Sequence, residues 1–317
     1  MAGLLIIGDV VTDVVARHRT PVAPGTDTEA DIVLRAGGSG ANTAAWAAHL
    51  GADARLLARA GYDTGSWHVA ELARAGVRPH VRIDAGHPTA VVIAMVDAAG
   101  ERTMLTTRGA SRRIGPDDWD DALLDGVGRV HVSGYTLFAP PGLELVRLAT
   151  RAALERGAPV SVDPASTGFL REFGPDRFLR ETAAATLVVP NRDEALLLTG
   201  APDAATAAEA LSARYGTAAV KLGPSGALLA VGGTVVHHAP GTTVTGDAAD
   251  SADAGDGKGV VDSTGAGDAF AAGTLAALLA GATAQEAVEA GCRAGAAAVT
   301  RVGGRPDSGR PVATAGR

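Results

Sequence analysis

Short apolar runs alternate with longer segments of helical periodicity along most of the chain. The run at residues 4–7 is apolar throughout and ends at Gly8 and Asp9, which indicates a strand buried on both faces. Ala- and Leu-rich segments separate most such runs, a pattern typical of a parallel sheet flanked by helices. The predicted strands are 4–7, 54–59, 129–133, 159–162, 186–189, 217–222 and 259–261, and the clearest predicted helices are 41–50, 64–75, 141–156, 203–214, 265–280 and 284–300.

Two stretches, 10–36 and 80–109, depart from this alternation. The second alternates polar and apolar residues and turns at Ala99-Gly100, as antiparallel strands do. We expect the two stretches to form a small separate sheet over the main one. Residues 246–258 carry several aspartates and glycines with no large apolar side chain, which predicts a mobile loop.

Composition narrows the functional class. Hydrophobic residues make up 46% and charged residues 20%, values that exclude a disordered or fibrous chain. The net charge is -7 and the basic residues are scattered, so nucleic acid is not an expected partner. No apolar run approaches the ~20 residues of a membrane span. The apolar run at the start of the chain is too short for the one expected in a signal peptide.

A single cysteine, Cys292, excludes an internal disulfide and a cysteine-based zinc site. We therefore expect a reducing compartment, and the cytoplasm is the default location.

The strongest chemical signal is the segment DSTGAGDAF at residues 262–270, between a predicted strand and a predicted helix. Gly265, Ala266 and Gly267 leave the backbone N–H groups of a helix N-terminus uncovered, which predicts an anion site. Asp268 in the first turn could accept a proton from an attacking hydroxyl. The alternative is that the glycines only permit a tight turn and Asp268 only caps the helix.

A second glycine-rich segment, GGSGANTA at residues 37–44, leads into the first predicted helix. Its small residues, among them Gly38 and Ser39, let a ligand approach the backbone, and Asn42 supplies both a donor and an acceptor. A close-packed turn explains the same residues equally well. Neither a dinucleotide fingerprint nor a P-loop is present, which argues against a nicotinamide dehydrogenase and a P-loop nucleotide site.

Together these two segments resemble the signatures of the ribokinase-like (PfkB-type) family of carbohydrate and nucleoside kinases. Between them, residues 191–194 (NRDE) resemble that family's N-x-x-E element, and residues 221–226 (KLGPSG) resemble its nucleotide-contacting turn. The resemblance implies a three-layer α/β/α fold with a mostly parallel central sheet and a small β-sheet lid. It also implies one kinase domain over residues 1–310, lid strands from about 10–36 and 80–109, and a flexible tail at 311–317.

The resemblance also implies roles for individual residues. Asp268 is then the catalytic base, and Gly265, Ala266 and Gly267 form the anion hole for the transferred phosphoryl group. Asn191 would contact the nucleotide, and Glu194 would hold Mg²⁺ through water. From the residues alone, a helix cap with a capping-box acid explains Asn191 and Glu194 as well.

Further positions follow from the same resemblance. Asp13 would bind two hydroxyls of the substrate, with Gly38, Ser39 and Asn42 beside it. Lys221, Gly223 and Gly226 would contact the nucleotide. Asp262 and Thr264 match positions that bind a monovalent cation such as K⁺ in some members.

The expected activity is ATP-dependent phosphorylation of a hydroxyl, in particular a hydroxymethyl group, of a sugar or sugar derivative. A nucleoside kinase acting on adenosine, cytidine or pseudouridine is the alternative, and a non-catalytic sugar sensor is a third possibility. The low aromatic content, 3%, favours sugars, because nucleobases commonly stack on aromatic rings. The resemblance further implies Mg²⁺ as cofactor and a homodimer formed through the lid.

Overall fold

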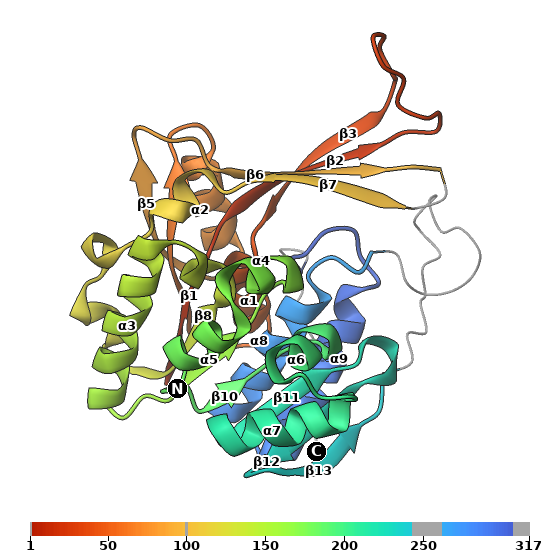
Figure 1. The fold of residues 1–317 in the computed structure, drawn as a ribbon. Coiled ribbons are helices and arrows are strands. Elements are labelled where there is room, and N and C mark those ends of the chain that lie inside the picture. The colour runs from red at the N-terminus through yellow and green to blue at the C-terminus, as the bar shows by residue number, and fades with distance from the viewer. Residues whose placement is uncertain (1, 99–100, 243–261, 307–317) are drawn as a thin grey trace.

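A nine-stranded sheet runs through the middle of the protein (Figure 1), in a computed structural model that describes residues 2–98, 101–242 and 262–306. Its strand order is β13-β12-β11-β10-β9-β8-β1-β4-β5, parallel from β11 to β5 and antiparallel at β12 and β13. The predicted strand 259–261, the acidic loop 246–258 and the tail 311–317 lie outside the described residues. The strands are β1 (Gly3–Ile7), β4 (Ala54–Gly61), β5 (Arg78–Asp84), β8 (Val127–Ser133), β9 (Val160–Asp163), β10 (Leu187–Val188), β11 (Thr217–Lys221), β12 (Ala227–Val231) and β13 (Thr234–Ala239).

Two hydrophobic cores lie on opposite faces of this sheet. Successive side chains of a strand point to opposite faces, so Leu5 and Ile7 of β1 belong to one core while Leu4 and Ile6 belong to the other. All four side chains are fully buried. Burial on both faces explains why β1 is an uninterrupted apolar run, and it confirms the predicted α/β architecture with a mostly parallel sheet.

Helices cover both faces of the sheet. The core that contains Leu4 is closed by α1 (Ser39–His49), α2 (Gly65–Arg74), α8 (Ala266–Leu279) and α9 (Ala284–Ala298). The core that contains Leu5 is closed by α3 (Pro140–Glu155), α4 (Thr167–Phe173), α5 (Pro175–Glu181), α6 (Arg192–Thr199) and α7 (Ala204–Tyr215). In the described part of the chain, no helix combines the length and the apolar character needed to cross a bilayer.

A small four-stranded sheet projects from the main body at one end (Figure 1). It consists of β2 (Val11–Arg17), β3 (Asp31–Gly37), β6 (Ala90–Val96) and β7 (Arg102–Thr107), in the order β3-β2-β6-β7. Two antiparallel hairpins, β2–β3 and β6–β7, join side by side through parallel pairing of β2 with β6.

The boundary of this small sheet differs from expectation at one point. Residues 80–84 belong to β5, which pairs in parallel with β4 at the edge of the main sheet. As an edge strand, β5 alternates exposed and partly buried residues, so its sequence resembles that of a half-exposed antiparallel strand. The second hairpin of the small sheet therefore begins at Ala90.

Candidate active site

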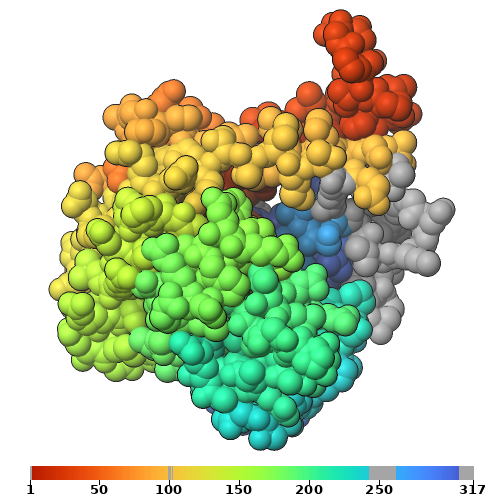
Figure 2. Space-filling model, in the orientation of Figure 1, coloured from red at the N-terminus to blue at the C-terminus, as the bar shows by residue number. Residues whose placement is uncertain are grey.

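A cavity of about 1110 Å³ lies between the small sheet and the ends of the central strands. Gly8 and Asp9 line it just beyond β1, and Tyr135 lines it just beyond β8. The strand order reverses between β1 and β8, and the crevice beyond the carboxyl ends of strands at such a switch point is the usual ligand site of open α/β sheets. Figure 2 shows the molecular surface hollowed below the strands of the small sheet, with the C-terminal helices at the back of the hollow.

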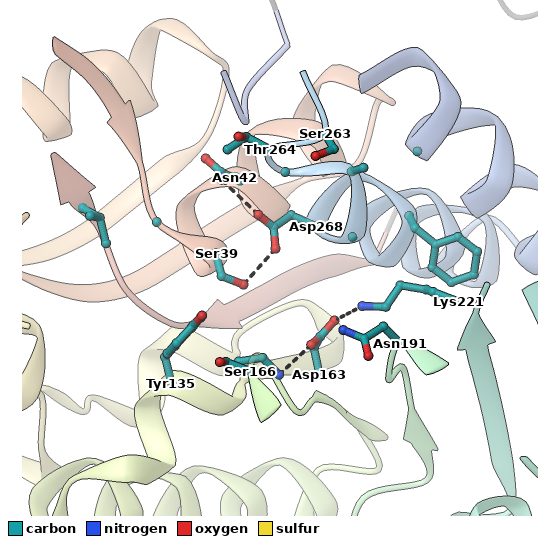
Figure 3. Close-up of a pocket in the computed structure, with 18 of the residues that line it drawn as sticks. Ser39, Asn42, Tyr135, Asp163, Ser166, Asn191, Lys221, Ser263, Thr264 and Asp268 are labelled. Carbon is teal, nitrogen blue, oxygen red and sulfur yellow. Dashed lines mark hydrogen bonds and ion pairs between the residues drawn. The ribbon is translucent and has the colours of Figure 1, made fainter. Parts of the chain in front are cut away.

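Asp268 lies in this cavity, in the first turn of α8. Its carboxylate accepts a hydrogen bond from Ser39 Oγ at 2.9 Å and another from Asn42 Nδ2 at 2.9 Å, both on α1 (Figure 3). Burial raises the pKa of Asp268 to about 7, and the charge of Asp163 acts in the same direction, while the bond from Asn42 lowers the pKa. A carboxylate with a pKa near neutrality that is buried in a cavity is suited to accept a proton.

The turn before Asp268 is built from glycines that are packed closely. Gly265 is the N-cap of α8 with φ +75°, and a Cβ there would lie 2.5 Å from Gly304 Cα. A Cβ on Gly267 would lie 3.3 Å from Lys221 Nζ, so this glycine keeps space beside a lysine ammonium group. The N–H of Ala266 donates a long bond of 3.3 Å to Ser263 O, so this amide is not bare. The site combines a helix N-terminus with a lysine, two features that attract an anion.

The glycines before α1 serve packing as well as the site. Gly38, the N-cap of α1, has φ +100°, and a Cβ on it would lie 2.6 Å from Asp9 O. A Cβ on Gly40 would lie 2.6 Å from Gly8 Cα. This close approach of α1 to the end of β1 places Ser39 and Asn42 next to Asp268, so the close-packed turn and the polar contacts occur together. We expected Ser39 and Asn42 beside the substrate, and in the structure both side chains bond to Asp268.

Two further aspartates of the N-terminal segment line the same cavity. Asp9 follows β1 and accepts the N–H of Gly40 at 3.1 Å. Asp13 lies on β2, against Gly37, where any side chain would collide with its carboxylate. Burial raises the pKa of Asp13 to about 6, the charge of Asp9 adds to this effect, and Arg305 opposes it. Hydroxyl groups of a ligand that donate hydrogen bonds to the carboxylates of Asp9 and Asp13 would reduce the repulsion between these two acceptors.

An ion pair between Lys221 and Asp163 also lines the cavity. Lys221 Nζ at the end of β11 contacts Asp163 Oδ2 at the end of β9 at 2.6 Å (Figure 3). Burial alone would lower the pKa of Lys221, but the charges of Asp163 and Glu194 raise it. Ala165, which donates its N–H to Asp163 Oδ1, has φ +76°, a strained conformation for a non-glycine residue.

The N-x-x-E element forms a capping box at the start of α6. Asn191 Oδ1 accepts the N–H of Glu194, and Glu194 Oε2 accepts the N–H of Asn191. Both residues also line the cavity. Burial raises the pKa of Glu194 to about 7, with a further increase from Asp163 and a decrease from Lys221. The capping explanation therefore holds.

The remaining predicted positions line the cavity or lie next to residues that line it. Gly223 and Gly226 belong to the turn after β11 and line it. Thr264 lines it as well, and the Asp262 carboxylate accepts the N–H groups of Thr264 at 2.9 Å and Gly303 at 3.0 Å. Asp262 therefore joins the start of α8 to the segment after α9. In the described residues, no group of three or more His, Cys, Asp or Glu side chains is arranged as a metal site.

Sequence reasoning missed two polar residues of this region. Asp163 ends an apolar strand at the same edge of the sheet as Asp9, and this position was the one signal for it, although its partner did not follow from the sequence. Arg305 donates to Gly37 O at 2.9 Å and, more weakly, to Asn42 Oδ1 at 3.4 Å. The second bond favours the amide orientation in which Asn42 Nδ2 faces Asp268. Arg305 lies in a segment without regular secondary structure, so no periodicity pointed to it.

Comparisons with known proteins agree with this geometry. The model of the pfkB family of carbohydrate kinases matches residues 1–309. The chain is 32% identical over 309 residues to an ATP-dependent ribose-1-phosphate kinase of Halopiger xanaduensis, covering 96% of this chain and 94% of that protein. It is 29% identical over 285 residues to a fructokinase of Klebsiella pneumoniae, covering 87% and 84%. Its structure resembles that of an adenosine kinase from Sinorhizobium meliloti with a TM-score of 0.83 at 26% identity, covering 96% of each chain.

Proposed function

Because this chain belongs to the pfkB family of carbohydrate kinases, we propose that it transfers the γ-phosphoryl group of ATP to a hydroxyl group of a sugar or sugar derivative. The observation that carries this proposal is the position of Asp268. Its buried carboxylate lies in a large cavity at the positive end of α8, held by Ser39 and Asn42.

The chemistry follows from this arrangement. The acceptor, in particular its hydroxymethyl group, gives its proton to Asp268 as its oxygen bonds to the γ-phosphorus. The bond from that phosphorus to the bridging oxygen breaks, and ADP leaves. Such a transition state needs placement and charge stabilisation more than a strong base. The amides and dipole of the Gly265–Gly267 turn, with Lys221 beside Gly267, supply positive potential at this point.

The nucleotide and the acceptor take opposite ends of the cavity in this proposal. ATP lies along Asn191, Lys221 and the turn that contains Gly223 and Gly226, and the acceptor lies against Asp13, Gly38 and Asn42. The carboxylate of Asp13 accepts hydrogen bonds from two hydroxyls. A cytoplasmic location belongs to the same proposal, because ATP is the phosphoryl donor and the single cysteine needs no oxidising compartment.

Magnesium belongs to the proposal through Glu194. This carboxylate is buried, lines the cavity and offers hard oxygen ligands of the type that Mg²⁺ takes, alone or through water. When bound, the ion neutralises charge on the phosphates of ATP. A K⁺ ion near Asp262 and Thr264 is a separate part of the proposal. Asp262 accepts hydrogen bonds from the backbone of Thr264 and of Gly303, and these bonds hold together the two loops that would bind the ion.

A nucleoside acceptor is the second candidate. The adenosine kinase from Sinorhizobium meliloti is the observation that favours it, together with Tyr135 and Phe169, which line the cavity and could stack on a base. A sugar stays our first choice, because the 32% identical relative is named for a sugar phosphate.

The small sheet acts in this proposal as a lid over the acceptor and as the contact between two copies of the chain. Asp13, Val92 and Thr106 lie side by side on the face that lines the cavity. The opposite face carries a row across neighbouring strands, Leu34–Val14–Ile93–Leu105, in which Leu34 and Leu105 are more than half exposed. A row of exposed apolar side chains on a projecting sheet suits a second copy of the same sheet.

The proposal is tested by measuring ADP formation with ATP and Mg²⁺ across pentoses, hexoses, sugar phosphates, sugar acids and nucleosides. We expect turnover with members of the sugar group and none in the Asp268→Asn variant, whose ATP affinity should stay within a few fold of the wild type. Turnover that persists in Asp268→Asn would refute the role of Asp268. Absence of turnover with every acceptor would refute the activity itself.

A further inference from the structure

Arg108 lies in the wall of the cavity at the end of β7. Its guanidinium group donates to two backbone carbonyls, Phe138 O at 3.0 Å and Tyr135 O, and lies 5.6 Å from the centroid of the Phe169 ring. Two carbonyls and an aromatic ring thus fix the orientation of the side chain. A guanidinium group has five N–H donors, so donors remain beyond the two that these carbonyls take.

The charge of Arg108 is not balanced by a contacting carboxylate. In the described part of the chain, the basic residues that line the cavity are Arg108 and Lys221, and Lys221 is paired with Asp163. No ion pair of the described residues includes Arg108. Burial lowers the pKa of Arg108, and Asp9 opposes this effect only from beyond contact distance. A half-buried arginine that is rigidly held and has no carboxylate in contact among the described residues is suited to bind an anionic ligand.

The position of Arg108 places it with the acceptor rather than with ATP. Thr106 of β7 is paired with Val92 of β6, and Val92 is paired on its other side with Asp13 of β2. Arg108 follows two residues after Thr106, and Tyr135 and Phe169, which it contacts, line the same region. Lys221 ends β11 of the main sheet instead, and Gly223 and Gly226 lie in the turn that follows it.

We propose that the acceptor is an anionic sugar, and that Arg108 binds its phosphate or carboxylate group while Asp13 and Asp9 accept hydrogen bonds from its hydroxyls. This inference rests on the proposed kinase function and specifies the substrate class. Three carboxylates, Asp9, Asp13 and Asp268, converge on the acceptor end, so a further anion requires a cation at its own position. Arg108 provides that cation with a planar group that matches both anions.

The experiment uses two matched pairs of acceptors with the full-length protein. Ribose 1-phosphate is compared with ribose, and 2-ketogluconate with fructose, by ADP formation and by thermal shift. In the wild type we expect kcat/KM to be at least about tenfold higher for the anionic member of one pair than for its neutral member. The pair that shows this difference identifies whether Arg108 binds a phosphate or a carboxylate group. A higher kcat/KM for the neutral member of both pairs would overturn the inference.

Variants separate recognition of the anion from support of the fold. Arg108→Gln should raise KM for the preferred anionic acceptor by about 10- to 100-fold and leave KM for its neutral partner and for ATP within about threefold. Arg108→Lys, which keeps the charge and loses the planar fork, should fall between. Arg112→Gln removes the same charge from an exposed neighbour outside the cavity and should change nothing.

The outcomes distinguish this inference from the proposed function. An equal rise of KM for both members of a pair in Arg108→Gln would make Arg108 a structural residue and overturn the inference, while kinase activity stands. If Arg108→Gln fails to fold, the inference is decided by the comparison of acceptors in the wild type and by the KM values of Arg108→Lys. Absence of ADP formation with every acceptor concerns the proposed function.

Discussion

At the scale of single residues, the buried carboxyl group of Asp268 determines when the proposed reaction can run. Burial raises its pKa to about 7, and only the deprotonated carboxylate can take a proton from the acceptor. Below pH 7 the group is increasingly protonated, so kcat/KM for the acceptor should fall as the pH decreases. We expect a profile that rises through about pH 7 and then levels off. A rate independent of pH between 5.5 and 8.5 would contradict this.

The hydrogen bond from Ser39 provides a sharper version of this test. It lowers the pKa of Asp268, so Ser39→Ala should move the midpoint of the pH profile upward by up to about one unit. Ser263→Ala is the matched control, because Ser263 lines the cavity from an exposed position and no described contact joins it to Asp268. A downward shift in Ser39→Ala, or the same shift in both variants, would contradict the assigned contact.

The position of a single residue in the cavity was predictable where a local motif surrounds that residue. Gly265 and Asp268 stand in a segment whose glycines and acid already indicate an anion site and a base. Asp163 and Arg305 were not predictable in this way, because their roles come from contacts with residues 58 and 263 positions away in the chain. A lone acid after a strand or a lone arginine in a loop has many possible partners, and only the fold selects one.

At the scale of elements, the turn into α8 depends on glycine for two different reasons. Gly265→Ala adds a methyl group in a left-handed conformation against the backbone of Gly304, so it should lower the melting temperature markedly. Gly267→Ala meets only the flexible end of Lys221, so it should stay folded and lose at least about tenfold in kcat by crowding the anion position.

Gly281→Ala is the control for backbone strain. Gly281 has φ +88° just after α8, and a Cβ there would meet open space. We expect a destabilisation of about 1 kcal/mol with unchanged kinetics. Circular dichroism melts and steady-state rates on the three variants check these expectations. Equal melting temperatures for Gly265→Ala and Gly281→Ala would contradict the close contact with Gly304.

The sequence predicted long elements well and short ones poorly. Helices α1, α3, α7, α8 and α9 begin and end within about two residues of expectation, because Ala- and Leu-rich segments continue over several turns and most of them end near a glycine. Helices α4 and α5, of seven residues each, were not predicted, since one or two turns carry too little periodicity. β5 was placed in the wrong sheet because its half-exposed edge has the pattern of an antiparallel strand.

At the scale of the whole molecule, the apolar row on the small sheet should decide the oligomeric state. We expect the mass of a dimer by size-exclusion chromatography with light scattering, and a monomer for Leu34→Asp or Leu105→Asp. Val236→Asp is the control, because Val236 is similarly exposed on β13 at the far edge of the main sheet. A monomeric wild type, or dissociation caused by the control, would contradict the proposed contact.

The overall architecture followed from the sequence because strands buried on both faces and amphipathic helices alternate along it. The cavity could not be predicted from the sequence in the same detail, because its walls come from both sheets and from both ends of the chain.

The hydrogen bonds between α1 and Asp268 join residues that are separated by 226 and 229 positions. During synthesis on the ribosome, the N-terminal donors exist long before the acid that they orient. A prematurely terminated or proteolytically shortened product that lacks α8 thus lacks Asp268, so under the proposed mechanism it has no group to take the proton of the acceptor.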